Sequence, residues 1–493
     1  MTDVSLQVLG AALRAVAEEM GVVLIRSAFS ANIKERRDCS TALFDRAGRM
    51  IAQAEHIPVH LGALPGAVDA VLARDPRPDA VYVLNDPFAG GSHLPDVTLV
   101  SCTALGFAVS RAHHADIGGM EPASLPAESR EIYQEGLVLP PVELTDDVLR
   151  IMLANARNPE ERRGDLRAQL AAHHLAKRRI DELVARRGAG VVAAAMDELY
   201  GYSARVVRAG LAAVPDGTYR AEDVLEARGR ELTLRVAVTV AGEEVTIDFV
   251  GTDPQYDGNL NCPLPVTQAA SYYVVRCLAA PDVPASGGAF EPVTVTAPAG
   301  CVVNARAPAA VVAGNTETSS RIVDVVLAAF GEAIDVPAQG QGTVNNVTLG
   351  NSRFTYYETL GGGQGASADL DGPSAVHVAM SNTLNTPVEA LELAYPLRVE
   401  RYAMRLGSGG AGAHRGGDGV VRAIRVLEDC RCSLLTERRA YAPRGARGGL
   451  DGSAGRNLLN GEPLPAKATI QLSAGDTITI ETPGGGGYGQ PSG

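Results

Sequence analysis

The sequence contains no tryptophan, and aromatic residues make up only 4% of its 493 residues. It therefore offers no obvious platform on which nucleic-acid bases stack. The formal net charge of −13 also argues against a nucleic-acid or anionic membrane surface as partner. No run of 18 apolar residues is present, so no transmembrane helix is expected. We expect neither nucleic acid nor a membrane among its partners.

Cysteine is also scarce. The seven cysteines are odd in number and scattered, and the close pair Cys430 and Cys432 lacks CxxC spacing. The N-terminal stretch carries Glu18 and Glu19, unlike a signal peptide. These features favour a reducing cytoplasmic location.

Nucleotide-binding and serine-hydrolase motifs are missing as well. The glycine clusters at 361–365 and 484–487 lack the Lys-Ser/Thr of a P-loop, and neither matches GxGxxG between a strand and a helix. No GxSxG elbow is present, so a serine hydrolase is unsupported. Tight turns or flexible ends are the simpler interpretation of both glycine clusters.

Glycine itself is abundant: 54 residues, about 11% of the chain, against roughly 7% in typical proteins. Helical periodicity marks residues 3–30 and a helical segment after residue 146, whereas period-two patterns begin near Gly217. The length exceeds that of a single core, and we expect an α+β architecture. Its predicted parts are an N-terminal mixed α/β metal-binding lobe (1–145), a helical insertion (146–214), a β-rich middle domain (215–335) and a Gly-rich, mostly β C-terminal region (336–493).

Residues 85–119 concentrate the candidate chemistry. This stretch holds three of the nine histidines, three aspartates and five glycines. A strand-like run joins two polar clusters and can fold both onto one point, and a further carboxylate precedes a strand at Asp38. Imidazole and carboxylate ligands together suit zinc, manganese or iron. The predicted ligands of one divalent metal are Asp38, His93, Asp96 and one of His113 and His114.

Two alternatives stay open at this stage. The His93-x-x-Asp96 spacing also arises by chance or as a capped turn. Adjacent residues of a strand point to opposite faces, so only one of His113 and His114 easily ligates, and the other is free to donate to a carboxylate such as Asp116.

Eight ordered blocks resemble the hydantoinase B/oxoprolinase family, and the resemblance covers essentially the whole chain. The blocks are RRDCSTALFD, NDPFAGGSHLPD, RAHHADIGG, GNTETSSR, GQGTVNN, YYETLGGGQGA, SNTLNTPVEALE and YPLRVERY. The resemblance implies a metal bound by two aspartates and two histidines, which carries to Asp38, His93, Asp96 and His113. It implies zinc for lactam hydrolysis and manganese in ketone carboxylation.

The resemblance also implies a partner. In this family the ATP-binding and phosphorylating machinery lies in a separate A subunit or A domain, which fits the missing P-loop. We expect a hydantoinase A-type ATP-binding subunit that uses ATP and Mg, a hetero-oligomer, and a small cyclic amide as substrate.

The expected reaction is attack of metal-activated water on a ring amide that the partner has phosphorylated. Asp116 or His114 is the candidate to take or relay the proton. Two alternatives are a subunit of an ATP-dependent ketone carboxylase resembling the acetone and acetophenone enzymes, and a non-catalytic scaffold for the A subunit. Weaker candidates for contacts to substrate or phosphate are Arg37, Arg111, Asn315, Glu317, Gly362 and Gly363.

Overall fold

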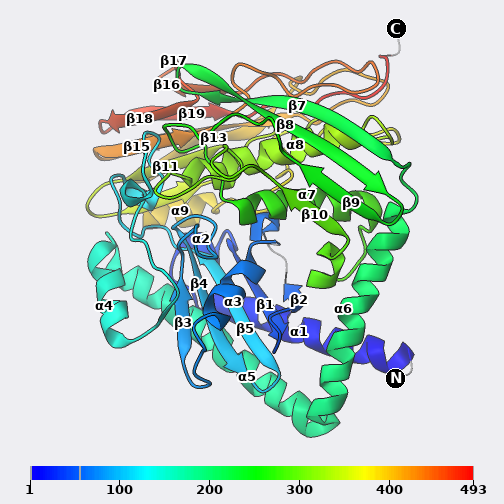
Figure 1. The fold of residues 1–493 in the computed structure, drawn as a ribbon. Coiled ribbons are helices and arrows are strands. Elements are labelled where there is room, and N and C mark those ends of the chain that lie inside the picture. The colour runs from blue at the N-terminus through cyan, green and yellow to red at the C-terminus, as the bar shows by residue number, and fades with distance from the viewer. Residues whose placement is uncertain (1–2, 55–56, 61, 492–493) are drawn as a thin grey trace.

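The computed structural model describes residues 3–54, 57–60 and 62–491. These residues form a mixed α/β fold with several β-sheets and flanking helices (Figure 1). Helices with bounds are α1 (Asp3–Ser27), α2 (Ala31–Lys34), α3 (Leu64–Leu72), α4 (Asp146–Asn155), α5 (Pro159–Arg187), α6 (Ala189–Leu211), α7 (Leu264–Ala279), α8 (Ser319–Phe330) and α9 (Val388–Ala394). Short helical turns are η1 (Pro58–His60), η2 (Pro122–Ser124), η3 (Ile132–Gln134), η4 (Gly287–Phe290) and the π-helical η5 (Gly314–Thr318).

The N-terminal sheet is antiparallel throughout and positions the candidate site. Its first two strands in the chain form an antiparallel hairpin. The strand order in the sheet is β2 (Met50–Ala54), β1 (Cys39–Asp45), β5 (Gly106–His113), β4 (Asp96–Thr103), β3 (Val81–Leu84) and β6 (Val142–Glu143).

Helices α1 and α5 pack against this sheet. Leu13, Met20 and Leu24 of α1 are fully buried, in an apolar cluster that also contains Leu43 of β1 and Ile180 of α5. The helical spacing of these apolar residues produces one apolar stripe, which the sheet and α5 cover.

The helical segment expected after residue 146 is confirmed. Helix α4 begins after Thr145, whose hydroxyl accepts from the Val148 amide. Helix α5 starts with Pro159 in its first turn, where the missing amide proton costs nothing. It ends at Gly188, whose φ of 84° breaks the helix before α6.

The middle of the chain builds a four-stranded sheet on two helices. Strand β7 (Gly217–Ala227) pairs with β8 (Arg230–Ala241), β8 with β9 (Glu244–Asp248), and β9 runs parallel to β10 (Val293–Thr296). Helix α8 packs on β7, β8 and α7.

The C-terminal part contains two further sheets. One has the order β12 (Thr355–Glu358), β11 (Asn346–Gly350), β15 (Cys430–Leu435), β18 (Lys467–Leu472). The other has the order β13 (Leu397–Arg405), β14 (Gly419–Val426), β19 (Thr477–Glu481), β16 (Arg456–Leu459), β17 (Glu462–Leu464).

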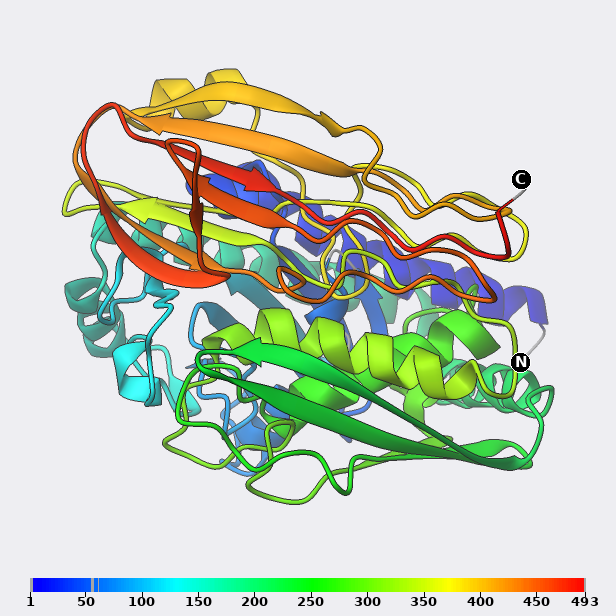
Figure 2. The ribbon, with the colours of Figure 1, turned by 90° about the horizontal axis from the view of Figure 1, so that it is seen from above.

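Glycine-rich extended segments run beside one another at one end of this region (Figure 2). They hydrogen-bond through backbone groups; for example, the Gly485 amide donates to the Gly417 carbonyl at 2.9 Å. A Cβ on Gly485 would lie 2.0 Å from the Gln364 carbonyl oxygen. The glycines are therefore required by close backbone approach.

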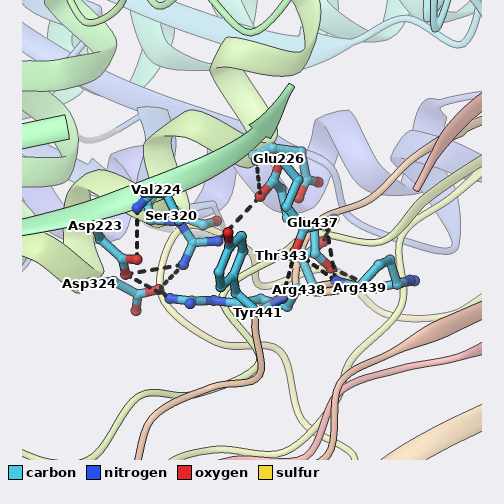
Figure 3. A network of polar contacts seen from close by, with 12 residues as sticks. Asp223, Val224, Glu226, Ser320, Asp324, Thr343, Glu437, Arg438, Arg439 and Tyr441 are labelled. Atoms are coloured by element: carbon cyan, nitrogen blue, oxygen red, sulfur yellow. Dashed lines mark hydrogen bonds and ion pairs between the residues drawn. The ribbon is translucent and has the colours of Figure 1, made fainter. Parts of the chain in front are cut away.

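A buried ion network joins the middle and C-terminal parts (Figure 3). Arg438 Nη2 lies 3.0 Å from Asp223 of β7 and 2.6 Å from Asp324 of α8. Arg321 of α8 contacts both aspartates and also Glu437, at 3.4 Å. Because all five side chains are at most 8% exposed, these ion pairs are little screened by solvent.

The division of the chain near residues 145, 215 and 335 stays a prediction. The largest apolar cluster includes Phe44, Val207, Phe249 and Leu435, so packing crosses all three positions. None of the helices in the described ranges is long and apolar enough to cross a membrane.

Candidate metal centre

Three strand ends meet at one edge of the N-terminal sheet. Asp96 is the first residue of β4 and pairs with His113, the last residue of β5. The His113 amide donates to the Asp38 carbonyl at 3.0 Å, immediately before β1. Because neighbouring strands run antiparallel, the start of β1, the start of β4 and the end of β5 lie at the same end of the sheet.

His93 reaches the same point through a short loop. The Asp96 amide donates to the His93 carbonyl at 3.1 Å, and Ser92 Oγ donates to Asp96 Oδ2 at 2.6 Å. Asn85 braces the loop by donating to the Leu94 carbonyl at 2.8 Å. Residues 93–96 therefore form a hydrogen-bonded turn that brings the side chains of His93 and Asp96 together.

His93, Asp96 and His113 form the candidate cation cluster. One ligand atom from each lies within 4.8 Å of the other two, and the residues are 1–2% exposed. His93 Nδ1 is 2.9 Å from Asp96 Oδ2, and His113 Nδ1 is 3.6 Å from Asp96 Oδ1. Asp38 lines the same pocket, but its carboxylate is not part of this group of three.

Unpartnered polar atoms test whether these residues fit a metal. Both ring nitrogens of His93, His113 Nε2 and Asp96 Oδ1 are buried and have no hydrogen-bond partner within the part of the chain that the structure describes. The 2.9 Å approach of His93 Nδ1 to Asp96 Oδ2 thus lacks hydrogen-bond geometry. Such buried groups cost about 1–3 kcal/mol each when unsatisfied, and a bound cation removes that cost. The donor set fits zinc, manganese or iron.

Charge at the cluster is uneven. Burial alone would raise the pKa of Asp96, but the imidazoles of His93 and His60, together with a contact to His113, hold that pKa well below its usual value. Burial lowers the pKa of His113, and Asp96 partly opposes this shift. The favoured state is an ionised Asp96 carboxylate beside a neutral His113 imidazole, which is the state of each group that coordinates metals.

His60 is a further site residue that the sequence reasoning missed. Its Nε2 lies 3.3 Å from Asp96 Oδ2, and its Nδ1 lies 3.0 Å from Ser40 Oγ. It lines the pocket and is 1% exposed. Only its proximity to the cluster in the fold identifies it, because no motif links position 60 to the 93–113 segment.

The pocket around the cluster is small, about 30 Å³. The wall facing the cluster comes from distant parts of the chain, and the Tyr357 ring stacks on His113 with centroids 4.7 Å apart. This volume holds an ion and a few water-sized groups. The remaining lining residues are Ile57, Val59, Asn315, Thr316, Val344, Thr359, Met380, Ser381 and Thr383.

Of the residues predicted around η5, Asn315 lines the pocket and Glu317 does not. Asn315 Oδ1 is buried and has no hydrogen-bond partner among the described residues. Glu317 accepts from the Val344 amide at 3.1 Å and from Asn346 at 2.9 Å. Burial raises the pKa of Glu317 to about 7. Residues 314–318 form a buried π-helical turn that leads into α8.

His114 and Asp116, the predicted proton-transfer residues, lie outside the pocket lining. His114 Nε2 is 3.0 Å from Gln169 Oε1 of α5, and burial lowers its pKa to about 4. Asp116 accepts from the amides of Gly118, Ala123 and Arg157 and pairs with the Arg157 guanidinium at 2.9 Å. Both residues follow the end of β5 at His113, and their side chains contact α5 and backbone amides.

The predicted anion-binding residues are also placed elsewhere. Arg37 is exposed, with φ of 57°. Arg111 is buried and donates to Thr98 Oγ1 at 2.8 Å, and burial lowers its pKa to about 10. A Cβ on Gly362 or Gly363 would lie 2.2 Å from Gln341 Oε1 or 2.0 Å from the Gly417 carbonyl oxygen. These glycines serve close packing away from the pocket.

Comparison with known proteins shows the family to which the chain belongs. The sequence profile of hydantoinase B/oxoprolinase matches residues 2–491. The chain belongs to the hydantoinase B/oxoprolinase family. It is 37% identical to 5-oxoprolinase 1 of Arabidopsis thaliana over 519 residues, covering 96% of this chain but only 41% of that protein. The chain thus spans about two fifths of that relative's length.

Other members of the family match over most of their length. A protein provisionally named as the B subunit of a D-/L-hydantoinase, from Pseudomonas sp. (strain NS671), is 31% identical and is covered to 90%. The ATP-dependent caprolactamase of Pseudomonas jessenii superposes with a TM-score of 0.92 at 28% identity, over 99% of this chain and 91% of that one. Acetone carboxylase superposes with a TM-score of 0.87 at 17% identity, over 99% of this chain and 75% of that one, which shows a shared fold.

Proposed function

We propose that this hydantoinase B family protein is the hydrolytic component of an ATP-dependent cyclic amidase. The observation that carries the proposal is the buried cluster of His93, Asp96 and His113, in which both His93 ring nitrogens, His113 Nε2 and Asp96 Oδ1 have no hydrogen-bond partner among the described residues. The similarity to caprolactamase supports the amide substrate class.

The proposed metal ligands are Asp38, His93, Asp96 and His113, with zinc as the expected ion and manganese or iron as alternatives. Bound there, a divalent ion supplies Lewis acidity and lowers the pKa of water near the substrate carbonyl. The chain's own contribution is to hold Asp96 ionised and the His113 imidazole neutral in a site that excludes bulk solvent.

In this proposal, residues of the pocket wall orient the substrate and the metal ligands. Asn315 Oδ1, an unpartnered acceptor, suits the N–H of a ring amide. His60 beside Asp96 is the pocket-lining group best placed to exchange a proton there, and replaces His114 and Asp116 in that proposed role. Tyr357 packs against His113 and limits its rotation.

An amide resists water because its nitrogen donates electrons to the carbonyl. Phosphorylation of the amide oxygen by a partner would make the ring carbon more reactive. One water then adds to that carbon, and the ring C–N bond breaks as nitrogen takes a proton, which leaves an acyl phosphate. A second water adds to the acyl carbon, the C–O bond breaks, and phosphate leaves with the electrons of that bond. The hydantoinase relative, named as a B-type component, supports an A-type ATP-binding partner that uses ATP and Mg.

A ketone carboxylase subunit is the second candidate, favoured by the fold shared with acetone carboxylase. A non-catalytic scaffold is the third. These alternatives predict different reactions from the same assembled complex, so they are separable by experiment.

The test is elemental analysis of the purified chain, followed by assay of the complex with its A-type partner. ATP consumption and ring opening are measured with hydantoin, 5-oxoproline and caprolactam, and carboxylation with acetone plus bicarbonate. The proposal predicts bound metal and ring opening, both lost in Asp38→Asn and His93→Ala. Full activity of both variants would identify a scaffold, and ketone carboxylation alone would identify the carboxylase.

A further inference from the structure

Arg36 is a buried cation that lies behind the pocket. It is fully buried, and no carboxylate of the described residues forms an ion pair with it. Its guanidinium donates to Asn32 Oδ1, the Tyr357 carbonyl and Thr359 Oγ1, each at 2.7 Å. It also lies 4.7 Å from the Tyr357 ring centroid. All these contacts are with neutral groups, so the positive charge is solvated but not neutralised, which is unfavourable in a buried position.

The charge is directed at the pocket through hydroxyl groups. Thr359, Ser381 and Thr383, here termed the hydroxyl wall, line the same pocket as the cation cluster. Arg36 donates to Thr359 Oγ1 at 2.7 Å and to Thr383 Oγ1 at 3.4 Å. A hydroxyl that accepts from a cation becomes a better donor for another acceptor.

His377 fixes the other side of the hydroxyl wall. Its Nδ1 lies 2.6 Å from Ser381 Oγ and its Nε2 lies 3.4 Å from Thr383 Oγ1. Burial and the nearby Arg36 lower the pKa of His377 to about 4, so the imidazole is neutral and carries one N–H. Thr359 and Thr383 are 2.5 Å apart.

A count of the available protons shows that the hydroxyl wall can donate a hydrogen bond. Three hydroxyls and one imidazole N–H supply four protons. The contacts among Thr359, Thr383, Ser381 and His377 use three of them, one in each contact. One hydroxyl proton is therefore left to donate into the pocket, and Arg36 lies behind it. A cation is disfavoured at this wall and an anionic oxygen is favoured.

We propose that the hydroxyl wall binds an anionic phosphoryl oxygen of the activated substrate, with Arg36 as the positioning residue that supplies charge through Thr359 and Thr383. The inference rests on the proposed function and deepens it. In the second step of the reaction above, phosphate leaves the acyl carbon with the electrons of the C–O bond, so negative charge grows on that phosphate oxygen. A preorganised donor facing that oxygen stabilises the charge as it develops.

The two sides of the pocket then have different tasks. The side formed by His93, Asp96 and His113 binds the cation, and the hydroxyl wall binds the anionic oxygen. The pocket admits one oxygen at the wall rather than a whole ring, which matches its volume of about 30 Å³. The ring itself must extend toward the mouth of the pocket.

Inorganic phosphate is the probe for this inference, titrated calorimetrically into the full-length chain with and without added zinc. Thr359→Val and Thr383→Val remove a hydroxyl and keep the shape. Each is expected to weaken phosphate binding about tenfold, equivalent to about 1.4 kcal/mol, with unchanged metal content and a modest loss of stability from the buried groups that lose a hydrogen bond. Thr479→Val on β19, far along the chain and outside the pocket lining, is the matched control and should bind phosphate normally.

Two variants of Arg36 distinguish the effect of its charge on phosphate binding from the effect of its shape. Arg36→Lys should retain phosphate affinity within about threefold because the charge is kept, whereas Arg36→Met should weaken it as much as the threonine variants. A purely structural role would affect both variants through stability and would give no rescue by lysine. Ser381→Ala replaces any variant that fails to fold.

The outcomes are distinguishable from those of the proposed function. Phosphate affinity within about twofold of wild type in both threonine variants overturns the inference, even if metal and ring hydrolysis are present. Tight bicarbonate binding with no phosphate binding also overturns it and favours a carboxylate ligand. Absence of bound metal counts against the proposed function. The phosphate titration of the metal-free chain still tests whether the hydroxyl wall binds phosphate.

Discussion

His113 and His114 are adjacent in sequence but serve opposite faces of the N-terminal sheet. His113 lines the pocket with His93 and Asp96, whereas His114 Nε2 lies 3.0 Å from Gln169 of α5. The alternation of a strand explains the separation, and α5 determines which face is covered. Chemistry and helix packing are thus divided between two neighbouring imidazoles.

This division predicts different metal contents for two variants. His113→Ala should lose most of the bound metal, because the cluster loses one of its donors. His114→Gln should retain it, because its contact is with Gln169. Elemental analysis of both purified proteins checks the prediction, and metal loss confined to the position 114 variant would contradict it.

Removal of metal should lower stability without abolishing the fold. The cluster lies at one edge of a sheet that already has an apolar core, so the secondary structure should survive chelation. Adding zinc back at about 100 times its dissociation constant should stabilise the chain by about 2.7 kcal/mol. Calorimetric melting curves measure this gain, and His93→Ala should show none. An equal gain in that variant would place the metal elsewhere.

The network of Figure 3 predicts a large effect from one arginine. Arg438→Met leaves Asp223 and Asp324 with fewer cationic partners in a buried position, and should destabilise the protein by about 3–5 kcal/mol. Arg447→Met, which breaks an exposed pair with Asp335, should cost less than about 1 kcal/mol. Urea unfolding compares the two, and similar losses would refute the assignment of the network.

Stability should fall at acid pH because of His173. Its ring lies between Ser101 and Ser110, at 2.6 and 2.9 Å, and burial lowers its pKa from 6.5 to about 3. Below pH 6.5 the unfolded chain binds a proton that the folded chain does not. The stabilising contribution is therefore complete above pH 6.5 and is lost as pH falls toward 3.

The change of the unfolding free energy with pH that His173 causes approaches about 1.4 kcal/mol per pH unit. His173→Asn should remove that share of the acid sensitivity, as measured by urea unfolding at about pH 7.5, 6.5 and 5.5. Other buried histidines such as His114 keep a residual slope. An unchanged slope in the variant would show that His173 is not the sensor.

Glycine substitutions should divide according to backbone contact. Gly485→Ala places a Cβ 2.0 Å from the Gln364 carbonyl oxygen and should destabilise the protein by several kcal/mol or prevent folding. Gly190→Ala in α6 meets nothing within 4 Å and should be neutral or stabilising by up to about 1 kcal/mol. Thermal melts of the two variants check this, and equal destabilisation would argue against close backbone packing.

The amino-acid sequence alone determined most secondary elements and the residue types of the candidate site. Helical periodicity placed α1, α5 and α6, and period two placed β7 to β9, because local side-chain patterns decide which face of an element is apolar. The spacing of His93 and Asp96 already described a turn. The strand-like run between the two polar clusters indicated that both could fold onto one point.

Only the tertiary structure decided which side chains meet in the pocket. It selected His113 over His114, placed His60 beside Asp96, and buried Arg36 while leaving Arg37 exposed. Thr359 and Thr383 lie far beyond His113 in the chain, so no local pattern links them to it. Side-chain direction depends on what covers each face, and that covering is supplied by segments distant in the chain.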